Sequence, residues 1–151
     1  MKTLHVYLVN VQDTTKKPSR YAALRPAGAR VFLPGDFAGK MPPISREMAS
    51  RIRPTAATAP GQSCSAVCGA VGMHCEPIAI PLVNNCTHLQ RAFGCATCTS
   101  SVGKEQPAYV VPTAPASSLP DTCLFTSDPG ASTCEASHPM TRRLCPCAVA
   151  A

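Results

Sequence analysis

The apolar residues of this chain form short stretches, and turn-forming residues interrupt them at close intervals. Leu4, Val6 and Leu8 alternate, which predicts a strand over residues 3–11. Residues 13–43 contain Lys-Lys-Pro, Arg-Pro-Ala-Gly, Pro-Gly-Asp and Pro-Pro, which favour loops. The N-terminal segment is therefore expected to hold one strand and little other regular structure.

A short helix is expected next. Ile44, Met48 and Ile52 recur at four-residue intervals, which places them on one face of a helix over residues 45–53. The stretch Thr55–Gly61 consists of small residues and proline, and it is expected to be a linker. We therefore place the domain boundary in this stretch.

After the boundary, a second helix is expected over residues 63–72. Ser63 is a suitable N-cap for it. Cys64 and Cys68 are four residues apart, so they would share one face of this helix. They should then tie that face to other segments rather than to each other.

The remaining chain is expected to be mainly loop. Proline and asparagine favour irregular chain from Glu76 onward. Leu89–Phe93 is a candidate helical turn, Tyr109–Val111 and Leu124–Thr126 are strand-like, and Asp128–Gly130 is a turn.

Cysteine changes this picture most. Cysteine makes up about 11 % of residues 64–151, above the roughly 8–10 % that flags a disulfide scaffold in a short secreted chain. The chain has no Trp and only 5 % aromatic residues, so its core is thin and needs covalent staples. The even count of ten fits complete pairing in an oxidising compartment. The expected disulfide positions are Cys64, Cys68, Cys75, Cys86, Cys95, Cys98, Cys123, Cys134, Cys145 and Cys147.

The expected architecture is a small, disulfide-rich α+β fold that is dominated by loops. Residues 1–60 form a basic, proline-rich N-terminal segment and linker with a possible strand over 3–11. Residues 61–151 form a cysteine-rich, disulfide-stapled domain with a short helix near residues 63–72 and few short strands.

The net charge of +6 is concentrated in the first 63 residues. The basic residues there are spread singly and few aromatic residues lie between them, unlike a surface that stacks on bases. A solvated linker is the simplest interpretation, and an arm that binds membranes or nucleic acid is the alternative. We expect no nucleic-acid partner, and no apolar run approaches the ~18–20 residues of a membrane span.

The start of the chain fits poorly with an oxidised protein. The apolar stretch after Met1 is short, contains His5 and has no small-residue cleavage site, so it is a poor signal peptide. We therefore expect this chain to be the end of a longer protein or an incomplete gene product.

Zinc binding is the main alternative to disulfides. Two short cysteine knuckles could supply thiolates, and a histidine could replace one of them. The second knuckle has only one intervening residue, and six other cysteines would remain, so we expect no metal and no other cofactor. The candidate ligands are Cys95, Cys98, Cys145, Cys147, His74, His88 and His138.

Catalytic and modification sites are also weakly indicated. A nucleophilic Cys75 beside His74 would need an exposed thiolate and a spatially arranged base, which adjacency in sequence does not supply. The carboxylates after residue 63 form no close pair in the sequence, although folding could assemble one. We expect no catalytic or cofactor-binding residue in this chain. Asn85-Cys86-Thr87 is an N-glycosylation acceptor motif at Asn85.

Two stretches of the cysteine-rich part, taken with the residues between their cysteines, resemble a known family. The first is GQSC-x3-C-x6-CEP-x3-P-x2-N, which begins at Gly61, and the second is C-x3-HP-x2-RRLCPC, which begins at Cys134. Together they resemble the C-terminal region of the α-1,6-mannosylglycoprotein 6-β-N-acetylglucosaminyltransferases of glycosyltransferase family 18. The resemblance covers about residues 61–147.

The resemblance implies a Golgi enzyme that transfers GlcNAc from UDP-GlcNAc to the α-1,6-mannose arm of N-glycans without a metal ion. Its catalytic lobes would lie upstream, so this chain alone would lack them and its own enzymatic activity stays open. The partners implied are those lobes, or a glycoprotein or glycan, in the Golgi lumen or outside the cell. The disulfide positions that carry over are Cys64, Cys68, Cys75, Cys95 or Cys98, Cys123, Cys134, Cys145 and Cys147.

The chain departs from the family in three places. It has Ile78-Ala79-Ile80 where the family has aromatic residues, and it stops soon after Cys147 where the family continues with two more cysteines. Cys86 and one of Cys95 and Cys98 have no counterpart, and they could pair with each other, for example as Cys86–Cys98.

We expect a non-catalytic C-terminal domain of a family 18-like enzyme, or else a free-standing secreted module that binds glycans or proteins.

Overall fold

The computed structural model describes residues 44–150, and all structural statements refer to this part of the chain. The strand expected over residues 3–11 and the loops expected over 13–43 lie outside the described residues. Within them, five disulfides, short helices and a mixed sheet make a disulfide-rich, loop-rich α+β fold, as expected.

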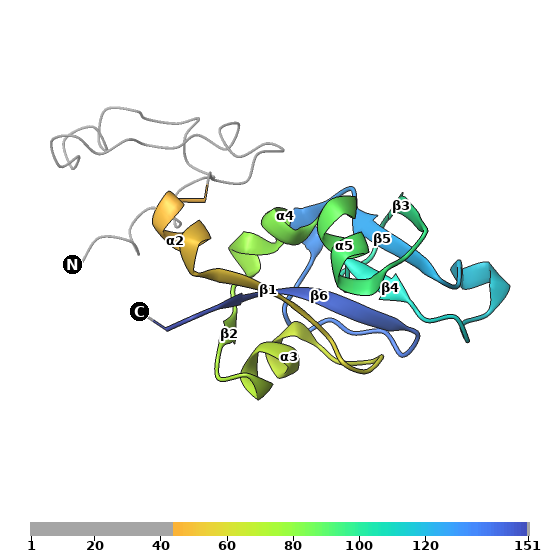
Figure 1. Ribbon diagram of the computed structural model, residues 1–151, viewed down its shortest axis with the longest axis horizontal. Coiled ribbons are helices and arrows are strands. Elements are labelled where there is room, and N and C mark those ends of the chain that lie inside the picture. Colours follow the sequence, from red (N-terminus) through yellow and green to blue (C-terminus); the bar gives the residue numbers. More distant parts are fainter. Residues whose placement is uncertain (1–43, 151) are drawn as a thin grey trace, which may run out of the picture. The chain divides into compact units, whose positions relative to one another are not determined.

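The sheet is built around β6 (Thr141–Ala148), shown in blue in Figure 1. Along one edge, β6 pairs antiparallel with β1 (Ile52–Ala56). Along the other edge, β4 (Ala108–Val110) lies beside the first half of β6 and the short β2 (His74–Cys75) beside its second half. The sheet continues beyond β4 with β5 (Thr122–Thr126) and then β3 (Thr97–Ser101), which runs parallel to β5.

A proline in the middle of β6 is unusual, because proline cannot donate to a strand ladder. Pro146 faces Pro54 of β1. Ala57 donates to the carbonyl of Arg143 at 2.8 Å, and the alternation of an antiparallel ladder then leaves the Pro54–Pro146 pair between hydrogen-bonded positions. On its other side, Pro146 accepts a hydrogen bond from the N–H of Glu76 at 3.0 Å. The missing N–H of Pro146 therefore disrupts only the short pairing with β2.

Helix α2 (Arg46–Arg51) confirms most of the helix expected over residues 45–53, but Ile52 and Arg53 begin β1 instead. Ser45 caps it, since its Oγ accepts from the N–H of Met48 at 3.1 Å. The linker expected over Thr55–Gly61 is wrong in its first part. Thr55 and Ala56 belong to β1, which pairs along its whole length with β6, so the folded part begins before the boundary that we placed there.

Helix α3 (Cys64–Ala70) confirms the second expected helix, and the Oγ of Ser63 caps it by accepting from Ala66 at 3.2 Å. The chain after Glu76 is more regular than expected. It forms the 3-10 helix η2 (Pro77–Ala79) and the helices α4 (Ile80–Val83) and α5 (Cys86–Phe93).

The two strand-like apolar stretches are β4 and β5. The expected turn at Asp128–Gly130 leads into the 3-10 helix η4 (Pro129–Ala131), and another 3-10 helix, η3 (Ala116–Ser118), follows β4. Strands β1, β2, β3 and β6 were not expected from the sequence.

Cysteine supplies much of the core. One buried cluster contains Ala57 and Val67 together with four cysteines, Cys64, Cys68, Cys145 and Cys147. A second cluster packs Cys95 and Cys123 with Val83, Leu89, Tyr109 and Leu144. The disulfides are therefore packed inside the domain rather than attached to its surface. In the described part, no helix has the length and apolar character needed to cross a membrane.

Candidate functional site

All ten cysteines are paired, and none is free. The five pairs are Cys64–Cys145, Cys68–Cys147, Cys75–Cys134, Cys86–Cys98 and Cys95–Cys123. Cys86–Cys98 is the pair that the sequence suggested for the two cysteines without family counterparts. The other four pairings could not be deduced from spacing.

Two parallel disulfides join α3 to β6. Cys64 and Cys68 lie one helical turn apart and bridge to Cys145 and Cys147, which point to the same face of the strand. Four helical residues rise about 6 Å and two strand residues about 6.6 Å. These lengths match, so one helical face can be tied to one strand face at two points. The expectation that Cys64 and Cys68 bind other segments is met in this structure.

The other disulfides tie the remaining segments. Cys75–Cys134 fixes the irregular chain before β6 to β2, and Cys95–Cys123 joins the end of α5 to β5. Because all ten cysteines are in disulfides, none is left as the free thiolate that a zinc site or a cysteine nucleophile requires. Among the described residues, no group of three or more His, Cys, Asp or Glu side chains could hold a metal ion.

Cys86–Cys98 differs from the other four bridges in exposure, because it alone has two half-buried partners while each of the others has at least one buried cysteine. Access governs the rate of thiol–disulfide exchange. We expect brief reduction of the native protein, followed by alkylation, to label Cys86 and Cys98 first. Peptide mass spectrometry measures this, and earlier labelling of Cys64 or Cys145 would contradict it.

Arg143 of β6 is completely buried. Its Nη1 donates to the carbonyls of Thr133 at 2.7 Å and Ala136 at 2.6 Å, while Nε and Nη2 have no partner. Burial lowers the pKa of Arg143 to about 10, and the charges of Glu105 and Glu135 oppose this effect. Arg143 therefore stays charged at neutral pH and holds the loop around Cys134 against the sheet.

Asn84 and Asn85 both bind backbone. The side chain of Asn84 acts like a strand partner, since Nδ2 donates to the carbonyl of Thr126 at 2.9 Å and Oδ1 accepts from its N–H at 2.8 Å. The Oδ1 of Asn85 caps α5 by accepting from His88 at 2.9 Å. Neither role was apparent from the sequence, and the contact of Asn84 joins segments that lie far apart in it.

Glycosylation of Asn85 stays a prediction. Its Nδ2 lies 2.8 Å from Nδ1 of His88 and donates to the carbonyl of Leu82 at 3.3 Å, so an attached glycan would replace one of two engaged N–H groups. We expect partial occupancy in protein secreted from eukaryotic cells, because the folded cap competes with attachment. Intact mass before and after enzymatic deglycosylation measures it, and a fully occupied or fully empty site would contradict it.

Tyr109 is the aromatic centre of the second core cluster. Its ring stacks on Phe93 with centroids 5.4 Å apart, and the guanidinium of Arg142 lies 5.3 Å from the centroid of Phe93. The hydroxyl of Tyr109 donates to Oδ1 of Asp121 at 2.6 Å. This hydrogen bond, together with burial and the charge of Asp121, raises the pKa of Tyr109.

The raised pKa predicts a pH effect. The folded domain holds the phenolic proton more tightly than the unfolded chain, so the stability from this contact is present below about pH 10 and is lost as pH rises through the folded-state pKa. We expect Asp121→Asn to lower the pKa of Tyr109, because it removes the carboxylate acceptor and its charge. Ultraviolet absorbance titration measures this, with Asp128→Asn as the control. An unchanged titration in Asp121→Asn would contradict it.

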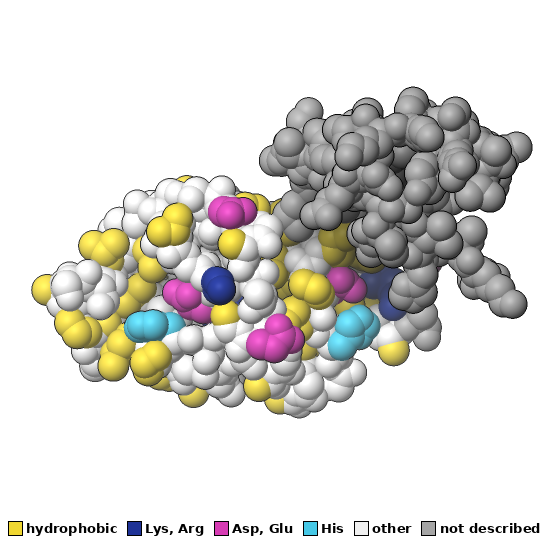
Figure 2. Space-filling model, turned by 180° about the vertical axis from the view of Figure 1, so that it is seen from behind, with side chains coloured by type: hydrophobic (Ala, Val, Ile, Leu, Met, Phe, Trp, Pro, Cys, Tyr) yellow, Lys and Arg dark blue, Asp and Glu magenta, His cyan; other side chains and the backbone are white. Residues whose placement is uncertain are grey.

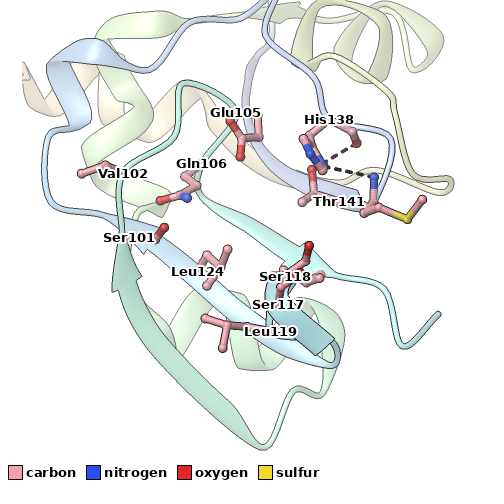
Figure 3. A pocket seen from close by; sticks show the side chains of 12 residues that line it. Ser101, Val102, Glu105, Gln106, Ser117, Ser118, Leu119, Leu124, His138 and Thr141 are labelled. Carbon is pink, nitrogen blue, oxygen red and sulfur yellow. Dashed lines mark hydrogen bonds between the residues drawn. The ribbon is translucent and has the colours of Figure 1, made fainter. Parts of the chain in front are cut away.

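A pocket of about 230 Å³ lies on the side of the sheet where β4, β5 and the segment before β6 meet (Figure 3). Glu105 and Gln106 enter it from the segment before β4, Leu119 from the turn that follows β4, and His138 from the segment before β6. The Nδ1 of His138 accepts from the N–H of Met140 at 3.2 Å. A neutral His138 therefore carries its proton on Nε2.

Of the sequence-predicted candidates, the structure brings only His138 to this pocket. His74 is exposed on β2 and His88 binds Asn85. On the described surface in Figure 2, Lys and Arg side chains do not gather into a patch. The pocket residues Glu105 and Gln106 were missed, because only the fold brings them to the residues around Leu119.

The fold and its bridges define a disulfide-stapled α+β domain, and five disulfides are typical of the secretory pathway. A family model for glycosyltransferase family 18 matches residues 29–147, which is most of the chain. The chain therefore belongs to glycosyltransferase family 18. A search of curated proteins finds no match.

Proposed function

We propose that this chain is a non-catalytic C-terminal domain of a family 18 enzyme that transfers GlcNAc from UDP-GlcNAc to the α-1,6-mannose arm of N-glycans. The match over residues 29–147 supports a role in such an enzyme. The cysteine frame that resembles the family's C-terminal region lies in the described part of the chain. The proposed site of action is the Golgi lumen, where glycoproteins are modified under conditions that preserve disulfides.

The double bridge between α3 and β6 is the observation that carries this proposal. It makes the helix and the central strand one rigid body without a large apolar core. Such a body suits a bracing role, because it holds its shape while larger lobes bind and release substrates. The partner would be the upstream catalytic lobes of the parent enzyme.

A transfer assay tests this proposal. The chain is incubated with UDP-GlcNAc and an N-glycan acceptor that carries the free α-1,6-mannose arm, and the product is measured by mass spectrometry. We expect no transfer by the chain alone, and transfer when the same chain is joined to the catalytic lobes encoded in frame upstream. Transfer by the chain alone, or an upstream frame without such lobes, would overturn the proposal.

The second candidate is a free-standing secreted module that binds glycans or proteins. The pocket favours it, because two exposed apolar side chains, Val102 at 80 % and Leu119 at 50 % exposure, stand at its rim. Binding of the isolated chain to a glycan array, without any GlcNAc transfer, would favour this function over the enzyme domain.

A further inference from the structure

We propose that the pocket between β4, β5 and the segment before β6 binds a primary alkylammonium group, such as the side chain of a lysine. This proposal goes beyond the bracing role and does not depend on it. It rests on an unpartnered buried amide, a carboxylate, an apolar wall and a strained rim, which all meet at one place.

The first observation is the amide of Gln106. The residue is 2 % exposed, and its Oε1 is buried without a hydrogen-bond partner. A buried acceptor without a donor costs about 1–3 kcal/mol, so a molecule that supplies a donor there is bound favourably. Figure 3 shows the Gln106 amide pointing into the pocket on the side of Ser101.

The second observation is the charge of the pocket. Among the described residues that line it, Glu105 is the only Asp or Glu, and no Lys or Arg lines it. Glu105 is half-buried, and the Nδ1 of His138 is engaged by the N–H of Met140. The buried cation Arg143 feels the charge of Glu105, but the carbonyls of the loop around Cys134 hold its guanidinium and it does not line the pocket. The pocket therefore favours a cation with N–H donors.

The third observation is the closeness of the Glu105 and Gln106 side chains. A Cβ placed on Gly103 would lie 2.7 and 2.8 Å from the carboxylate oxygens of Glu105 and 2.8 Å from Nε2 of Gln106. The carboxylate of Glu105 and the amide nitrogen of Gln106 therefore converge over this glycine, and the free amide oxygen belongs to the same amide group. An ammonium has three donors, so it could bind the carboxylate, the amide oxygen and a hydroxyl such as that of Ser101 together.

The fourth observation is the wall and rim. Val110, Leu124 and Met140 line the pocket with apolar surface that suits an alkyl stem. Leu119 adopts a left-handed backbone conformation with φ of 55°, and its side chain is half exposed at the rim. Strained backbone of this kind is concentrated at ligand-binding sites. The exposed Leu119 and Val102 would lose water contact when the stem enters.

The probe is n-butylammonium, followed by NMR chemical-shift titration of the whole chain. We expect it to shift the amide signals of the pocket residues and to bind at least about tenfold more tightly than n-butanol, which lacks the charge. Trimethylbutylammonium keeps the charge but lacks N–H donors, so it should also bind more weakly. Nα-acetyl-lysine amide and 1,5-diaminopentane then distinguish a protein lysine from a free polyamine as the source.

Two variants and one control complete the test. Glu105→Gln removes the charge and should weaken n-butylammonium binding at least about tenfold. Gly103→Ala keeps the charge but displaces Glu105 and Gln106, and it should weaken binding with little change in melting temperature. Glu47→Gln, on α2, should leave binding unchanged. Absence of n-butylammonium binding, equal binding of n-butanol, equal binding of trimethylbutylammonium, or unchanged binding by Glu105→Gln would each overturn the proposal.

Discussion

Removing both disulfides between α3 and β6 is expected to destabilise the domain by more than the sum of the two single removals, and either single removal leaves it folded. The single removals are Cys64→Ala with Cys145→Ala, and Cys68→Ala with Cys147→Ala. Each should cost about 2–3 kcal/mol, because the neighbouring bridge keeps the loop short. Removing both should cost about 6 kcal/mol, since the chain must then close a longer loop. That loss is comparable to the total stability of many domains.

The informative quantity is the amount by which the loss of stability in the combined variant exceeds the sum of the two single losses. Urea unfolding of the wild type, the two single-bridge variants and the combined variant gives the coupling free energy, which should be about 1 kcal/mol. The matched control removes Cys86–Cys98 together with one α3–β6 bridge, and these losses should simply add. A combined variant that loses only the sum of its parts would show that the two bridges do not act on one helix–strand unit.

Arg143→Met is expected to lower the stability of the domain by about 2–4 kcal/mol. The substitution fills a similar volume, but it leaves the part-buried carbonyls of Thr133 and Ala136 without their donor. The loop around Cys134 should then loosen, so its amides exchange faster with deuterium while those of α3 do not. Thermal and urea unfolding measure the loss of stability.

Arg91→Met is the matched control, because Arg91 is exposed at the end of α5 and should change stability by less than about 0.5 kcal/mol. Equal stability of Arg143→Met and Arg91→Met would mean that the buried guanidinium does not hold the loop.

Local sequence patterns predicted the helices and strands that are determined by residues close together in the sequence. Apolar spacing predicted α2, and the N-cap Ser63, which acts within one helical turn, predicted the start of α3. The apolar stretches that became β4 and β5 carry the usual residues of buried strands. In these segments, propensity and tertiary structure agree.

The central strand β6 could not be predicted in this way. Its sequence contains Arg143 and Pro146, two residues that argue against a buried strand. Arg143 is tolerated because loop carbonyls accept from it, and Pro146 because it faces Pro54 at a position without a ladder hydrogen bond. Both conditions depend on segments far away in the sequence.

The candidate sites also include some features that the sequence predicted and others that depend on segments far apart in the sequence. The shared face of Cys64 and Cys68 indicated that they would bind other segments, but their partners are about eighty residues away and required the fold. The pocket around Gln106 gave no sequence signal, because its residues come from several separate segments. Motif reading identified the family frame, and only the structure shows which side chains are left without partners.

The most direct test of the stapled domain is a disulfide map of the non-reduced protein. Cys64 and Cys68, like Cys145 and Cys147, have no tryptic site between them, so the map needs partial reduction with stepwise alkylation or electron-transfer fragmentation. The predicted result is no free thiol and five pairs, including Cys64–Cys145 and Cys68–Cys147. A Cys64–Cys68 pair, or free thiols that bind zinc, would contradict it.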